Sequence, residues 1–202
     1  RSDWPGMLAL LRQRPVEFML ALASFVGVVL FGVIEGVAGA ITLSLLVMVW
    51  NAWHPYHTVL VRVDGMKGYH DAARHPEGRL VPGLVLFRWD EQLFFANADL
   101  FREAVLQAVA DAPTPTRQVI VAADAVNDID VTAADMLGEL DHELEARGID
   151  LQFAGLKGHV RDLIIRYGLS PRFDAEHFHP TVGNAVNVYR AQHDVKWKDW
   201  DE

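Results

Sequence analysis

Cysteine is absent from this 202-residue sequence. Its absence excludes a disulfide framework, a thiolate nucleophile and any zinc site with cysteine ligands. The sequence also lacks a Gly-x-Ser-x-Gly motif, a Walker motif and a dinucleotide fingerprint. His177 and His179 could place two imidazoles on one strand face, but no third ligand is evident nearby, so we expect ordinary surface histidines. These absences predict a protein that is not an enzyme and that holds no metal and no cofactor.

Basic residues are few, with 18 Lys and Arg against 27 Asp and Glu, for a formal net charge of −9. Binding to a nucleic-acid backbone requires a basic surface, so we expect no nucleic-acid partner. Only three basic and three acidic residues fall among the first 50, so the whole imbalance lies in the remainder. That remainder is predicted to be a well-solvated cytoplasmic domain.

Charge is almost missing from residues 18–50, where Glu35 is the single ionisable side chain. A straight helix of that length would extend about 50 Å, whereas the hydrocarbon core of a bilayer is about 30 Å thick. One continuous span would also place Glu35 near the midplane, at a cost of roughly 2.5–3.5 kcal/mol. We therefore predict two transmembrane helices within residues 18–52, covering 18–34 and 36–52, with the turn at Glu35.

Basic residues flank this apolar run, with Arg12 and Arg14 before it and Arg62 and Lys67 after it. By the positive-inside rule, both ends of the hairpin are expected in the cytoplasm, with residues 1–17 as a cytoplasmic lead-in. Glu35 is expected to be a solvated carboxylate at the membrane interface. A transport carboxylate is the alternative, since intramembrane charges are functional by default.

Small residues recur every four positions through the apolar run, at Gly32, Gly36, Ala40 and Ser44. Such a stripe lets helix backbones approach closely in lipid, although small residues are also simply common in membrane helices. A lone hairpin would leave this packing face empty, and the sequence begins without an initiator methionine. We therefore expect the carboxy-terminal piece of a longer membrane protein.

The second part has the pattern of one α/β domain. Residues 53–81 lack sustained periodicity and are predicted to be a linker, with a short strand at 59–63. The regular elements that follow are a β-hairpin of residues 84–88 and 92–96, strands at 118–123 and 151–154, and helices at 99–110, from Thr132 to Gly148, at 158–167 and at 180–191. This order predicts a mostly parallel central sheet with flanking helices. Residues 192–202 are predicted to be a frayed tail.

Three segments together resemble the SulP sulfate-permease family: IEGVAGAITLSLL at 34–46, LVRVDGMKGYHD at 60–71 and PGLVLFRWDEQLFFANA at 82–98. They are similar to the end of that family's membrane domain, its linker and the start of its cytoplasmic STAS domain. The resemblance implies a transmembrane helical hairpin followed by an α/β STAS domain. The implied boundaries are 18–52 for the last two transmembrane helices, 53–81 for the linker and 82–191 for the STAS domain.

The resemblance also implies a function. It implies a secondary active transporter of an inorganic anion, sulfate or bicarbonate-like, that is coupled to protons or sodium or works by exchange. The family's substrate site lies at broken helices upstream of these residues, so no substrate-binding residue is expected here. A multi-pass protein of the cell membrane is implied, surrounded by the lipid bilayer. Its cytoplasmic STAS domain would serve regulation, folding or assembly of a homodimer.

Two other functions remain open at this point. One is a membrane-tethered STAS signalling or interaction protein that is not itself a transporter. The other is an enzyme domain on a membrane anchor, which predicts a catalytic constellation that the sequence does not show.

A regulatory loop is implied at the start of the second STAS helix. In the related anti-sigma-factor antagonists this loop reads Asp-Ser-Ser-Gly and carries a phosphorylated serine, whereas the matching residues here are Asp130, Val131, Thr132 and Ala133. Val131 replaces that serine, which argues against a phosphoswitch. Thr132 is predicted to be the N-cap of the helix. The helix start could also bind a cytoplasmic protein or a nucleotide, although neighbouring aspartates disfavour an anion.

Overall fold

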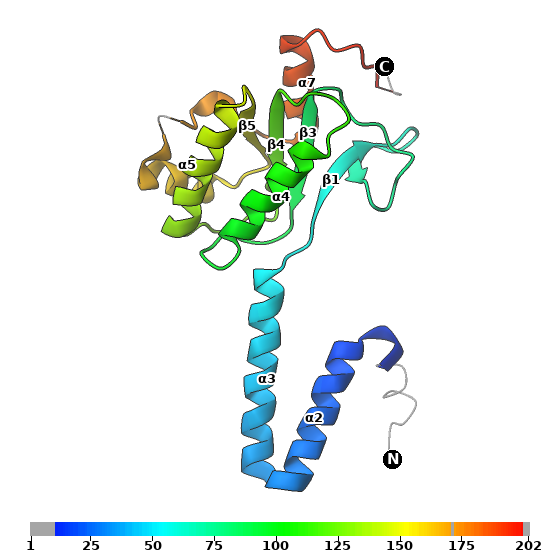
Figure 1. The fold of residues 1–202 in the computed structure, drawn as a ribbon, viewed down its shortest axis with the longest axis vertical. Coiled ribbons are helices and arrows are strands. Elements are labelled where there is room, and N and C mark those ends of the chain that lie inside the picture. The colour runs from blue at the N-terminus through cyan, green and yellow to red at the C-terminus, as the bar shows by residue number, and fades with distance from the viewer. Residues whose placement is uncertain (1–10, 171, 200–202) are drawn as a thin grey trace. The chain divides into compact units, whose positions relative to one another are not determined.

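The computed structural model describes residues 11–170 and 172–199 of a chain that divides into two units, Arg1–Trp53 and His54–Glu202 (Figure 1). The first unit is a helical hairpin of α2 (Pro15–Phe31) and α3 (Val33–Trp53). The helix α3 is long and apolar enough to cross a membrane, and α2 is a shorter apolar helix. Of the predicted lead-in, residues 1–10 lie outside the described residues, and residues 15–17 belong to α2.

The hairpin turns at Gly32, so the predicted turn at Glu35 is wrong by three residues. Gly32 has a φ of 102°, a backbone conformation that is open to glycine and strained for other residues. Glu35 therefore lies in the first turn of α3, where a carboxylate is favoured by the positive end of the helix dipole. The Glu35 side chain reaches back toward Gly32, and a Cβ atom on Gly32 would lie 3.0 Å from its Oε2.

The two helices are in close contact at Gly36, which is buried. A Cβ atom at this position would overlap the backbone of Val28 on α2, and a Cβ atom on Gly27 would lie 3.4 Å from the Gly36 Cα. The small-residue stripe thus packs the hairpin against itself at Gly36, whereas Ser44 on the same stripe is exposed. Large apolar side chains cover the outside of the hairpin, and Phe25 and Ile34 are 68% and 80% exposed.

The second unit contains a six-stranded sheet in the order β2-β1-β3-β4-β5-β6. Its strands are β1 (His57–Arg62), β2 (Tyr69–Asp71), β3 (Leu84–Trp89), β4 (Gln118–Ala122), β5 (Asp150–Ala154) and β6 (Phe178–His179). The pairings from β3 to β6 are parallel, as predicted, whereas β1 is antiparallel to both β2 and β3. The segment predicted as a linker therefore supplies two strands of a mixed sheet.

The predicted second strand of a hairpin at 92–96 is wrong, because this segment is a turn that leads from β3 into a helix. The Asn97 side chain holds the turn by accepting from the Phe94 N–H at 3.0 Å and donating to the Gln92 carbonyl at 2.9 Å. Leu93 forms an isolated parallel bridge with Ile129 and is buried. The chain therefore passes from β3 to β4 by a helical crossover, which parallel strands require.

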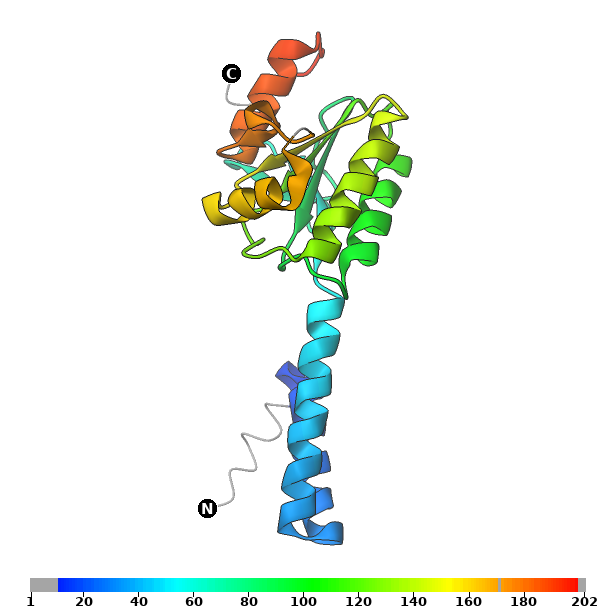
Figure 2. The ribbon, with the colours of Figure 1, turned by 90° about the vertical axis from the view of Figure 1, so that its left-hand side faces the viewer.

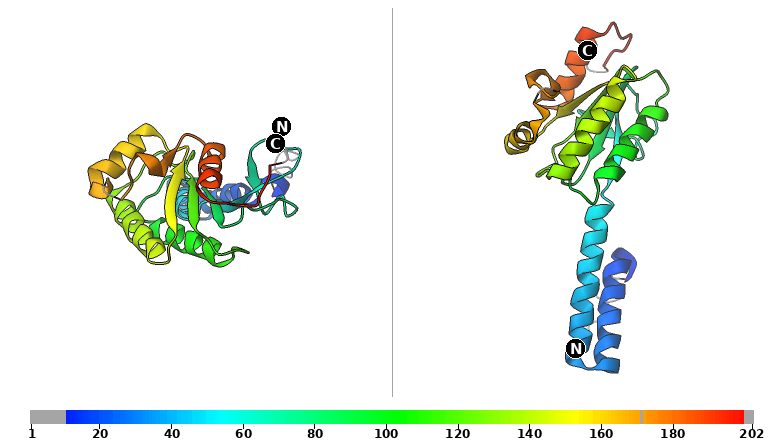
Figure 3. Two further views of the ribbon diagram at one scale, coloured as in Figure 1. Left: turned by 90° about the horizontal axis from the view of Figure 1, so that it is seen from above. Right: turned by 60° about the vertical axis from the view of Figure 1, so that its left-hand side comes forward.

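The helices cover both faces of the sheet (Figures 2 and 3). They are α4 (Ala98–Ala110), α5 (Val131–Glu145), α6 (Gly158–Ile164), which continues as a π-helical turn (Ile165–Leu169), a 3-10 turn (Ala175–His177) and α7 (Val182–Gln192). The predicted helix at 180–191 begins later than expected. Thr181 is its N-cap and accepts from the Asn184 N–H at 3.1 Å, so Pro180 precedes the cap.

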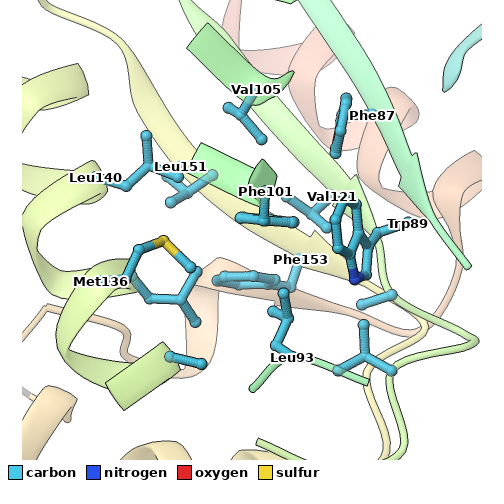
Figure 4. Close-up of a cluster of buried hydrophobic side chains, with 14 of the residues drawn as sticks. Phe87, Trp89, Leu93, Phe101, Val105, Val121, Met136, Leu140, Leu151 and Phe153 are labelled. Carbon is cyan, nitrogen blue, oxygen red and sulfur yellow. The ribbon is translucent and has the colours of Figure 1, made fainter. Parts of the chain in front are cut away.

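Residues of β3 alternate between two hydrophobic cores. Phe87 and Trp89 pack beneath α4, where the rings of Trp89 and Phe101 meet edge to face at 5.2 Å (Figure 4). Leu84 and Leu86 point to the opposite face, which α7 covers. Because both faces of β3 are covered, the strand reads as an almost continuous apolar run.

The described part of the predicted frayed tail is ordered against the domain, so that prediction is wrong for residues 193–199. Their side chains alternate between half-buried and exposed, and Trp197 lies between Arg79 and Arg190. Asp199 forms an ion pair with Arg62 at 2.7 Å. The rest of the tail, 200–202, lies outside the described residues.

Candidate interaction site at the start of helix α5

The start of α5 is capped by Asp130 rather than by Thr132. Asp130 has an extended backbone, with φ −92° and ψ 173°, and its Oδ1 accepts from the Ala133 N–H at 2.8 Å. Thr132 already lies inside the helix and is exposed. The predicted N-cap at Thr132 is therefore wrong by two residues, because the capping hydrogen bond to the Ala133 N–H comes from the Asp130 side chain and the helix begins at Val131.

Asp130 also joins two loops that are distant in sequence. Its Oδ2 accepts from the Phe95 N–H at 2.8 Å. The backbone continues this connection, because the Leu93 N–H donates to the Asp128 carbonyl and the Asp130 N–H donates to the Leu93 carbonyl. Both carboxylate oxygens of Asp130 are thus engaged in holding the loop after β3 against the loop after β4.

Two large apolar side chains project beside this junction. Phe95 is 69% exposed and Val131 is 55% exposed. We name these two residues, with the exposed Thr132, the Phe95–Val131 patch. Exposed apolar patches rimmed by polar groups are typical of interaction sites, and the exposed Asp124 and Asp128 lie on the adjoining loop. Val131 belongs to the loop that the resemblance implies, whereas the apolar neighbours of Phe95 predict a strand, so sequence patterns do not reveal Phe95 as part of this site.

The chain enters the domain at the same end of the strands. His57, the first residue of β1, is in register with Trp89, the last residue of β3, and their rings stack at 5.6 Å. The loops after β3 and β4 leave from this same end of the sheet because the two strands are parallel. The Phe95–Val131 patch and the beginning of the domain therefore lie at the same end of the strands.

A carboxylate, Asp71, joins the end of β2 to the start of β1. Tyr56 and Thr58 donate hydrogen bonds from their hydroxyl groups to Asp71, and the Ala73 N–H donates to its Oδ1 at 2.8 Å. Hydrogen bonding from Tyr56, then from Thr58, lowers the pKa of Asp71 to about 2. The same hydrogen bond to Asp71 raises the pKa of Tyr56.

The two histidines near β6 contact other side chains of the domain. His177 is half-buried and lies 2.8 Å from Asp174 and 3.5 Å from Asp150. His179 is only 8% exposed and contacts Gln152 at 2.6 Å, so the prediction of a surface histidine is wrong for this residue. In the part of the chain that the structure describes, no group of three or more His, Asp or Glu side chains could hold a metal ion.

Comparison with known proteins places these observations in a family. The model of the STAS domain matches residues 75–185. A probable sulfate transporter of Mycobacterium tuberculosis is 36% identical over 181 residues, which cover 90% of this chain and 32% of the relative. Sulfate transporter 3.1 of Arabidopsis thaliana is 24% identical over 196 residues, which cover 92% of this chain and 30% of the relative.

A solved structure has the same fold. The murine Solute Carrier 26 family member A9 anion transporter, in the inward-facing state, superposes with a TM-score of 0.81 at 19% identity, over 94% of this chain and 31% of that chain. The present chain spans about a third of the length of the curated relatives. The chain belongs to the STAS domain family, in the form that follows apolar helices in sulfate-permease-type transporters.

Proposed function

We propose that this chain is the carboxy-terminal part of a secondary active transporter of an inorganic anion, sulfate or bicarbonate-like. The observation that carries the proposal is the 36% identity with a probable sulfate transporter over 181 of 202 residues. A match of that length includes much of the apolar hairpin as well as the STAS unit. The substrate site itself belongs to helices outside this chain.

In this proposal the hairpin is the last membrane-spanning part of a multi-pass protein of the cell membrane. At about 1.5 Å per residue, the 21 residues of α3 extend about 31 Å, which matches the hydrocarbon core. The exposed apolar side chains of both helices would contact lipid or neighbouring helices. Arg12 and Arg14 before the hairpin and Arg62 after it support a cytoplasmic location for both ends.

The STAS unit would regulate the transporter or assemble it into a homodimer. The Phe95–Val131 patch is suited to contact another protein surface, because it is apolar, exposed and held by the two hydrogen bonds of Asp130. Val131 cannot be phosphorylated, so regulation at this loop would proceed through binding. Its rim of aspartates favours a protein partner over a nucleotide.

The rival function, a tethered signalling protein, is less well supported. The relatives that match both the hairpin and the STAS unit are named as transporters.

Anion uptake by the full-length protein tests the proposal. The protein is reconstituted into liposomes, and the entry of radiolabelled sulfate and of radiolabelled bicarbonate is followed with and without an inward proton or sodium gradient. We expect uptake of at least one anion above that of protein-free liposomes, and its suppression by excess unlabelled anion. Folded protein that carries neither anion under any gradient would contradict the proposal and favour the tether.

A further inference from the structure

A cavity of about 800 Å³ lies on the face of the sheet that α7 covers, and the proposed transport function leaves it unused. Its walls come from β1 and β2 on one side, the ends of β3 and β4 on another, and the first turn of α7. Charged and polar groups predominate in the lining, which includes Arg62, Arg88, Asp90, Asp124, Thr181 and Asp199.

Arg62 is the most deeply buried charged group of this cavity, with 4% of its surface exposed. Its Nη1 donates to the carbonyls of Met66 and Gly68 at 2.8 and 2.7 Å. Its Nε donates to Asp199 at 2.7 Å. Burying a charge is costly unless it is paired and hydrogen-bonded. The carbonyls orient the guanidinium, and the carboxylate of Asp199 supplies a negative charge beside it.

Asp199 reaches Arg62 on a short extended segment, residues 193–199, that we name the strap. Figure 3 shows it running from the end of α7 toward the β1–β2 side of the domain. Trp197 anchors the strap between the guanidinium groups of Arg79 and Arg190, at 5.4 and 5.1 Å from the ring centroid. The Arg79 Nη1 also donates to the Lys198 carbonyl at 3.0 Å. The strap therefore carries a carboxylate into the cavity from outside the sheet.

The charges that line the cavity specify what could replace this carboxylate. Arg88 is paired with Asp90 at 2.6 Å, and Asp124 lies near them as a second acidic group. Without Asp199, the described lining would carry two positive and two negative charges. A single negative charge beside Arg62 would give the lining the same net charge of −1 that it has with Asp199, whereas a dianion would add one more negative charge to a lining that includes Asp124.

We propose that this cavity binds a small monovalent carboxylate-type anion on Arg62, and that Asp199 occupies the same position when the anion is absent. The planar guanidinium matches the geometry of a carboxylate, which can accept two parallel hydrogen bonds. Binding would displace Asp199 and loosen the part of the strap that follows Trp197. The site would thus couple the concentration of a carboxylate or of bicarbonate to the state of the carboxy-terminal strap.

Calorimetric titration of the full chain in lipid nanodiscs tests this inference. The probes are sodium acetate, bicarbonate and sulfate, at constant ionic strength with chloride. The tethered Asp199 competes at an effective concentration of roughly millimolar or above, so wild-type protein binds acetate weakly. Asp199→Asn removes the competitor and is expected to tighten acetate binding about tenfold or more, because the competent fraction rises. Asp194→Asn, an exposed strap residue, is the matched control and should behave as wild type.

Two further variants keep the test independent of the first. Trp197→Ala loosens the strap while retaining Asp199 and should also tighten acetate binding, whereas Arg62→Lys in the Asp199→Asn background should abolish it. Hydrogen exchange across residues 193–199 should accelerate when wild-type protein is saturated with acetate. The proposal is overturned if Asp199→Asn and Trp197→Ala, both folded by circular dichroism, bind acetate no more tightly than wild type, or if sulfate binds as well as acetate. Because no transport is measured, these outcomes do not depend on the proposed function.

Discussion

Asp130 and Phe95 lie 35 residues apart in the chain, yet the carboxylate of one accepts a hydrogen bond from the backbone N–H of the other at 2.8 Å. The second oxygen of the same carboxylate caps α5. One side chain therefore fixes both the position of an exposed aromatic residue and the start of the helix beside it. The result is an exposed apolar surface whose backbone is held at two points by the Asp130 carboxylate.

Asp130→Ala is expected to destabilise the chain. Loss of an N-cap costs about 0.5–2 kcal/mol, and loss of the hydrogen bond to Phe95 costs about 0.5–1.5 kcal/mol. The free energy of unfolding, measured by urea titration with circular dichroism, should fall by roughly the sum. Thr132→Ala, two residues further on, is the matched control and should change it by less than about 0.5 kcal/mol. An equal loss of unfolding free energy in the two variants would indicate that Thr132 also caps the helix and would contradict the assignment to Asp130 alone.

Gly36→Leu is expected to separate α2 from α3, because a side chain at Gly36 overlaps the Val28 backbone. Since the chain has no cysteine, spin labels at cysteines introduced in place of Phe25 and Leu45 report this distance without other modification. Helix axes pack about 8–10 Å apart depending on the side chains between them, so we expect an increase of about 2 Å. Gly39→Leu is the control, since a Cβ atom there meets nothing within 4 Å. An unchanged distance in Gly36→Leu would contradict the close contact.

The sequence patterns predict most of the second unit because its central elements are long or strongly apolar. The helix α4 and the strands β4 and β5 follow from periodicity and from runs such as QVIVA. The predicted short strand at 59–63 overlaps β1, whereas the three-residue strand β2 escapes prediction because pairing with β1, rather than its own pattern, makes it a strand. Likewise, residues 92–96 have an apolar strand-like pattern, but the Asn97 side chain closes them into a turn.

The candidate site is predicted only in part, for a similar reason. Asp130 and Thr132 are both good capping residues, and the contact of Asp130 with Phe95, which is distant in sequence, accompanies its role as the cap. The hairpin has glycines at several positions, and the positive φ that selects Gly32 is visible only in the folded chain. The function of Glu35 stays a prediction, because its place beside Gly32 does not distinguish an interfacial carboxylate from a transport residue.

Asp71 should make the stability of the chain depend on pH in the acid range. Its pKa is about 2 in the folded state and near the ordinary 3.8 when unfolded, so the unfolded chain binds more protons between these values. The stabilisation is fully present above about pH 4 and is lost as the pH falls toward 2. Asp71→Asn should flatten the change in urea midpoint between pH 4.5 and about 2.5 relative to wild type, and Asp162→Asn, an exposed aspartate, should not. If the urea midpoint of Asp71→Asn falls with pH as steeply as that of wild type, the acid sensitivity comes from other carboxylates.

Replacing the apolar side chains of the Phe95–Val131 patch tests whether it is an interaction surface. Phe95→Ser combined with Val131→Ser removes two side chains that are 69% and 55% exposed, so the free energy of unfolding should change by less than about 0.5 kcal/mol for each. If the patch contacts a partner surface in the assembled transporter, the full-length variant should reach the membrane in normal amount but lose most of its anion uptake or its ability to dimerise.

The matched control is Ile165→Ser, which replaces an apolar residue that is 44% exposed. Its effect should be small, because Ile165 lies on the π-helical turn after α6 and not on the loops that Asp130 joins. Equal loss in the patch variant and in Ile165→Ser would mean that any removal of surface hydrophobicity impairs the protein, and the patch would then have no specific role.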